Sequence, residues 1–105
     1  MYRATTPKHI FTLPISTSDC KDILVTYAQK GKVVLEKFMN DGNLPSGMTL
    51  DGDDVIVVLT QEEANLFSEI MATVQIRVLT NGGKACASRR FNISIKGVDN
   101  DVVLS

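Results

Sequence analysis

The chain has 105 residues, enough for one domain, and 44% of them are hydrophobic while 22% are charged, a balance that excludes a disordered chain. Eleven basic residues against twelve acidic ones give a formal net charge of −1, which excludes the strongly basic surface of a nucleic-acid-binding protein. Apolar runs such as Val55–Leu59 are far shorter than the roughly 20 residues that cross a bilayer, so we expect neither nucleic acid nor a membrane as a partner.

The first residues, MYRATTPKHIFTLP, lack the basic start and the long apolar stretch of a secretory signal, so we expect the protein in the cytosol. Apolar and polar residues alternate over His9–Pro14, which predicts a strand. The proline that ends it lacks a backbone donor, so we expect an opening or edge strand. A second strand is predicted over Ile23–Gln29. The glycine within Lys30–Lys32 then favours a tight turn, and Val33–Phe38 is the returning strand of a hairpin.

The middle of the chain contains a loop, a strand and a short helix. Met39–Asp54 is rich in Gly, Asn, Asp, Pro and Ser, which predicts a long loop with a short strand at Met48–Leu50. Val55–Thr60 is apolar at every position but the last, which is typical of a central strand covered on both faces. Thr60 and the glutamate three residues later have the spacing of a capping box, so we expect a helix over Gln61–Phe67.

A second hairpin is predicted between Val74 and Ile95. Its first strand alternates strictly, and the NGG at Asn81–Gly83 provides the positive φ angles of a hairpin turn. Arg89 breaks the alternation of the returning strand, so we expect either a bulge there or an arginine side chain that reaches the sheet edge. The residues of the returning strand that we expect to share the inner face are Ala85, Ala87, Phe91, Ile93 and Ile95.

These elements predict an all-β fold, a small antiparallel immunoglobulin-like β-sandwich of about six or seven strands with one short helix between two of them. The immunoglobulin name refers to the architecture alone, because the chain has no tryptophan for the usual core position. We expect a single domain over 1–105, with 97–105 as a flexible or partner-docking tail. The expected core residues are Val25, Tyr27, Val57, Val74, Ile76, Val78, Phe91 and Ile93.

The residues with catalytic potential are few. Cys20 and Cys86 are the two cysteines, and in a reducing compartment we expect free thiols and no disulfide between them. With His9 as the one histidine, the chain falls short of the four ligands of a structural zinc site, and we expect His9 on the surface. We therefore expect no catalytic residue, no metal, no cofactor and no enzymatic activity.

Two groups of residues are candidates for binding a partner. Arg77, Arg89 and Arg90, with Lys84 across the turn, can form a basic patch for a partner's carboxylates, the alternative being a solvated sheet face. Val102, Val103 and Leu104 form an apolar, β-prone cluster after a turn-forming segment, which would be a pairing hazard if exposed. We expect these three residues to dock on a neighbouring copy or a partner, the alternatives being packing on their own domain or disorder.

Three segments carry a family resemblance: ATTPKHIFTLPISTSDCKDILVTYAQKGKVVLEK, VIVVLTQEEANLF and VQIRVLTNGGKACAS. Over roughly Tyr2–Ile95, the chain resembles small phage and prophage proteins of Gram-positive bacteria and is similar to the N-terminal sandwich domain of siphophage upper baseplate proteins. The resemblance implies a non-enzymatic assembly part whose partner is itself or another phage tail protein, with a homo-oligomer as one form. It also implies a protein made in the bacterial cytoplasm before assembly and associated with the virion afterwards.

A small ligand-binding module, for example for carbohydrate, is the alternative function from another class. Carbohydrate sites combine an aromatic platform with a few polar groups. The chain offers four phenylalanines and two tyrosines as candidates for such a platform and no tryptophan.

Overall fold

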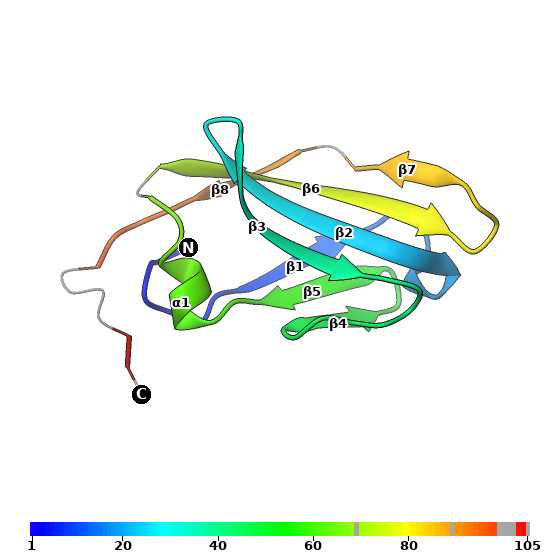
Figure 1. Cartoon of the computed structure of the whole chain (residues 1–105), viewed down its shortest axis with the longest axis horizontal. Helices are drawn as coiled ribbons and strands as arrows, with labels where there is room; N and C mark the ends of the chain where they lie inside the picture. The colour runs from blue at the N-terminus through cyan, green and yellow to red at the C-terminus, as the bar shows by residue number, and fades with distance from the viewer. Residues whose placement is uncertain (69, 89, 99–102, 105) are drawn as a thin grey trace.

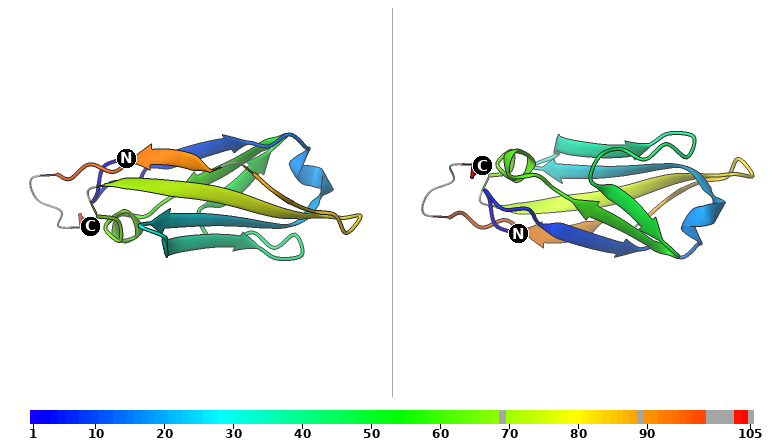
Figure 2. Two further views of the ribbon diagram at one scale, coloured as in Figure 1. Left: turned by 90° about the horizontal axis from the view of Figure 1, so that it is seen from above. Right: turned by 90° about the horizontal axis from the view of Figure 1, so that it is seen from below.

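A computed structural model describes residues 1–68, 70–88, 90–98 and 103–104. Two antiparallel sheets face each other, as the views from above and below show (Figure 2). The small sheet has the strand order β1 (Lys8–Thr12), β5 (Asp54–Val58), β4 (Met48–Asp51). The large sheet has the order β3 (Lys32–Met39), β2 (Cys20–Gln29), β6 (Met71–Thr80), and beyond β6 it continues with β7 (Ala85–Ala87) and β8 (Phe91–Ser94), which both pair with β6.

This strand order confirms the predicted all-β, immunoglobulin-like sandwich. In that fold one sheet pairs strands B, E and D, and the other pairs C′, C, F and G. The small sheet has this order, with β1 in the place of strand B, β5 in that of E and β4 in that of D. In the large sheet, β3 takes the place of C′, β2 that of C, β6 that of F and the β7–β8 pair that of G. The described residues form eight strands rather than six or seven, because the returning strand of the second hairpin is divided into two.

The hydrophobic core lies between the sheets and follows the alternation of the strands. Val25 of β2 lies opposite Ile76 of β6, and both side chains point inward and are buried. Of the eight expected core residues, Phe91 and Ile93 are partly buried and pack against the cluster. The other six are buried: Val25, Tyr27, Val57, Val74, Ile76 and Val78.

The expectation that β5 is covered on both faces is wrong. Val55 and Val57 are buried in the core, but Ile56 is only half-buried and Val58 is 40% exposed. β5 is the central strand of the small sheet, and its outer face has no second layer above it. Hydrophobicity at every position therefore did not indicate burial on both faces.

Local signals set the turns and the helix start. Lys30 and Gly31 both have positive φ, as a two-residue hairpin turn requires. The capping box is confirmed, since the amides of Thr60 and Glu63 are each bonded by the other residue's side chain. Helix α1 (Gln61–Ala64) ends earlier than predicted, because the chain turns and buries Phe67 against Tyr27. In the described ranges, no helix is long and apolar enough to cross a membrane.

The second hairpin departs from its predicted alternation. Arg77 lies opposite Ala87, whereas the register of Val74 with Phe91 would place Arg77 opposite residue 88. The shift of one residue between β7 and β8 turns Ala85 and Ala87 outward, so their predicted inner position is wrong, while Phe91 and Ile93 keep it. Arg89, where a bulge was predicted, lies outside the described residues.

Replacing Ile76 with alanine should lower the free energy of unfolding by about 2 to 5 kcal/mol, because the side chain is fully buried between the sheets. Urea denaturation measures this loss, and a β-type circular dichroism spectrum verifies the fold. Ile10→Ala is the matched control, since Ile10 is 56% exposed and its loss should cost no more than about 0.5 kcal/mol. An Ile76→Ala protein as stable as its parent would contradict the assigned core.

Candidate functional site

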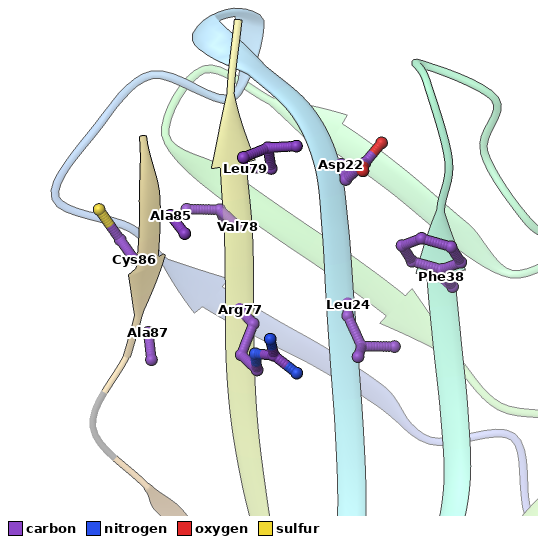
Figure 3. Close-up of a pocket in the computed structure, with 9 residues that line it drawn as sticks. All are labelled: Asp22, Leu24, Phe38, Arg77, Val78, Leu79, Ala85, Cys86 and Ala87. Atoms are coloured by element: carbon purple, nitrogen blue, oxygen red, sulfur yellow. The ribbon is translucent and has the colours of Figure 1, made fainter. Parts of the chain in front are cut away.

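The outer face of the large sheet carries a groove of about 540 Å³, which we call the outer groove (Figure 3). It lies across β3, β2, β6 and β7, on the side of the sheet that faces away from the core. The residues that line it are Asp22, Leu24, Phe38, Arg77, Val78, Leu79, Ala85, Cys86 and Ala87.

A row of four directly paired residues forms the floor of the outer groove. Phe38 lies opposite Leu24, Leu24 opposite Arg77, and Arg77 opposite Ala87, so the row crosses all four strands. Side chains paired in this way on one face lie about 5 Å apart at Cβ. The alanines of β7 are much smaller than the leucines and the phenylalanine of the other strands, which leaves the β7 side of the groove hollow.

Arg77 supplies the positive charge of the outer groove. None of the described residues forms a hydrogen bond or an ion pair with its guanidinium. Its neighbours in the row, Leu24 and Ala87, are apolar, and Phe38 at the far end is 46% exposed. Asp22 lines the same groove, and one of its carboxylate oxygens accepts a hydrogen bond from the Asp41 amide at 2.8 Å. The outer groove therefore offers an arginine beside exposed apolar surface.

The predicted basic residues are distributed along the second hairpin. Arg77 lines the outer groove, while Arg90 is exposed between β7 and β8 and Lys84 is exposed beside the β6–β7 turn. The predicted Arg89 lies outside the described residues. Sequence reasoning missed Leu24 and Phe38 as candidates, although apolar residues at outward positions of two paired strands were a usable signal.

The described docking residues of the tail, Val103 and Leu104, lie at the end of the sandwich that carries α1. Val103 is half-buried, and the Leu104 side chain is 76% exposed. The side-chain amide of Gln61 donates to the Leu104 carbonyl and accepts from the Leu104 amide, both at 2.7 Å. Val102 lies outside the described residues. The backbone of Leu104 thus contacts its own domain, while its side chain faces solvent.

His9 occupies an inward position, so the expectation of a surface histidine is wrong. It lies opposite Val57 in the small sheet, and its Nδ1 atom is 2.8 Å from the Tyr27 hydroxyl. Burial, together with the N-terminal positive charge, lowers the pKa of the His9 imidazole below 6.5. Burial and the nearby Glu63 carboxylate raise the pKa of the Tyr27 hydroxyl. The neutral side chains of His9 and Tyr27 thus join β1 of the small sheet to β2 of the large sheet.

A partly buried ion pair lies at the edge of the large sheet. Lys37 of β3 points inward, and its ammonium donates to the Glu63 carboxylate at 2.6 Å and to the Ser46 carbonyl at 3.0 Å. Burial by itself would raise the pKa of Glu63, but the bonds from Lys37 and Thr60 outweigh it and lower that pKa. Each of these charged groups therefore has a partner inside the fold, unlike the guanidinium of the outer groove.

Cys86 is the thiol that lines the outer groove. It is exposed on β7, whereas Cys20 is buried at the start of β2, and both are free thiols.

No family model, curated protein or solved structure matches the chain. The functional assignment therefore depends on the groove itself and on the resemblance of the sequence.

Iodoacetamide should modify Cys86 well before Cys20 in the native protein, because Cys20 is buried and burial, followed by the charge of Asp19, raises the pKa of its thiol. Intact-mass measurement should show one adduct under native conditions. Both thiols should react after denaturation without reductant. A Cys86→Ser protein should lose the fast adduct, and an equal rate for both thiols would contradict the assigned burial.

The free energy of unfolding should fall as the pH drops from about 7.5 to about 5.5. The folded state lowers the pKa of His9, so its stabilising effect is complete above 6.5 and is lost as the pH falls through the lowered pKa. Urea titrations of the parent and of His9→Gln test this, because His9 is the one histidine of the chain. The variant should show a smaller decrease, and an equal decrease would refute the assignment to His9.

Proposed function

We propose that the protein is a non-enzymatic structural module that acts through protein–protein contacts on the outer face of its large sheet. The outer groove supports this proposal, because it combines exposed Phe38 with the arginine at position 77, which has no partner among the described residues. Aromatic residues and arginine are the side chains most enriched at the centres of protein interfaces. Covering apolar surface there stabilises a complex by roughly 25 cal/mol per Å² before the costs of association.

The setting that we propose is a phage or prophage tail, close to the baseplate. The resemblance of residues 2–95 to small proteins of this group supports it. The partner is another copy of the chain or a second tail protein, which implies assembly in the bacterial cytoplasm and later association with the virion. In this role the tail residues Val102, Val103 and Leu104 are a second contact, supported by the solvent-exposed side chain of Leu104.

Carbohydrate binding is the second candidate function, and the shape of the outer groove favours it. Among the described residues that line the groove, Phe38 is the one aromatic side chain, and Arg77 and Asp22 are the charged ones. Binding of a carbohydrate at this site would require these three side chains. A screen of oligosaccharides with the parent protein and Phe38→Ser distinguishes this function from assembly.

Light scattering should give a solution mass above the 11.5 kDa of one chain, and the double variant Phe38→Ser, Arg77→Glu should shift the mass toward that of the monomer. The variant removes the aromatic contact and reverses the charge at the centre of the groove. Val33→Ser is the matched control, because Val33 is 58% exposed on the same strand as Phe38 and lies outside the groove. A parent protein that is monomeric at all concentrations would exclude self-assembly.

Deleting residues 102–105 should reduce the oligomer mass while the β-type circular dichroism spectrum is retained, because Val103 and Leu104 are not part of the core cluster. Gln61→Ala is the companion variant, since it removes the two hydrogen bonds that hold the Leu104 backbone on its own domain. An unchanged mass distribution after the deletion would restrict the contact surface to the outer groove.

A further inference from the structure

Among the described residues, none pairs with the outer backbone edge of strand β7. It is the last strand of the path β3-β2-β6-β7, and Ala85, Cys86 and Ala87 are all exposed. Hydrogen bonds run from the Thr80 amide to the Lys84 carbonyl at 2.9 Å and from the Ser88 amide to the Ile76 carbonyl at 2.7 Å. In an antiparallel ladder such bonded pairs alternate, so Cys86 also faces β6. Ala85 and Ala87 therefore direct their N–H and C=O groups away from β6.

Two other strand edges carry features that oppose pairing with a further strand. β3 has the buried, inward-pointing ammonium of Lys37, and β1 lies between Pro7 and Pro14. Inward charges and prolines are known devices against edge-to-edge association. Ala85–Ala87 has neither a charge nor a proline, and its side chains are small enough for another strand to approach closely.

Hollows lie on both faces of β7. The outer groove is on one face, and an inner hollow of about 70 Å³ is on the other. Val78, Cys86 and Ala87 line both of them, and Leu13, Pro14 and Ile15 close the inner hollow from the side of the small sheet. A strand added to β7 directs successive side chains to opposite faces of the sheet, so it would place them alternately in the two hollows.

Charge defines the chemistry of the added strand. Arg77 projects into the outer groove, and Lys84 and Arg90 are exposed on either side of β7 along the chain. A second β7 would bring the same positive charges together, which is unfavourable. A carboxylate on the incoming strand would instead meet the arginine with a charge-assisted hydrogen bond.

We propose that β7 is an acceptor edge for an extended segment of a partner protein, with apolar side chains for the inner hollow and a carboxylate for Arg77 in the outer groove. This proposal rests on the proposed function, since it specifies how a partner makes contact. The chain contains such a pattern itself, Asp-Val-Val-Leu at 101–104. The described tail residues Val103 and Leu104 are at the α1 end, opposite to β7 (Figure 1), so these two residues do not occupy the acceptor edge of their own chain.

The test is a titration of the ¹⁵N-labelled full chain with an acetylated and amidated peptide of sequence Asn-Asp-Val-Val-Leu-Ser. Amide shifts should concentrate on Ala85–Ala87, and Arg77→Ala should weaken binding about tenfold, as should a peptide with lysine in place of aspartate. Methylation of a single peptide amide should abolish binding at every second position along the peptide and should be tolerated at the positions between. Such alternation is specific to strand addition, because only every second amide faces β7.

Ala87→Pro should also abolish binding, because it removes an outward N–H and leaves the ladder to β6 intact. Ala87→Ser retains the N–H and should bind within about twofold of the parent. The proposal would be overturned if the peptide did not bind, or if all of the N-methylated peptides bound equally well. Both outcomes are measured on the parent protein. The proposed function is tested separately, since Phe38→Ser with Arg77→Glu would still reduce the solution mass if only the strand-addition mode were wrong.

Discussion

The antiparallel pairing of β2 with β6 is the constraint on which the rest of the structure depends. The two strands are the longest of the sandwich, and their register places Val25 opposite Ile76 on the inner face and Leu24 opposite Arg77 on the outer face. Side chains alternate with a period of two, so a slip of one residue would exchange the two faces completely. The hydrophobic core and the outer groove are therefore two results of a single register.

The two edges of the large sheet differ in charge and in side-chain size. At β3, the Lys37 ammonium is buried and paired with Glu63, which also closes the capping box of α1. A buried charge of this kind is costly to leave unpaired, so the interaction joins the edge strand to the helix. At β7 the side chains are small and uncharged, and the edge remains accessible.

A glycine adds a further constraint to the small sheet. Gly47 has a positive φ, and a Cβ at this position would overlap the carbonyl of Val58. Its own carbonyl accepts the hydrogen bond of the Val58 amide at 2.7 Å. The loop before β4 therefore packs directly on the backbone of β5, and the Lys37 ammonium reaches the neighbouring Ser46 carbonyl from the same loop.

Most of the strands, the turn at Lys30–Gly31 and the capping box were determined by the sequence alone, because alternation and turn chemistry act over a few residues. The arginine at the centre of the candidate site was also predicted, from its outward position in an alternating strand. The one-residue shift after Ala87, the inward position of His9 and the open outer face of β5 were decided by the tertiary structure. Each depends on which segment lies opposite, and that is set by contacts between residues far apart in the chain, which no local pattern records.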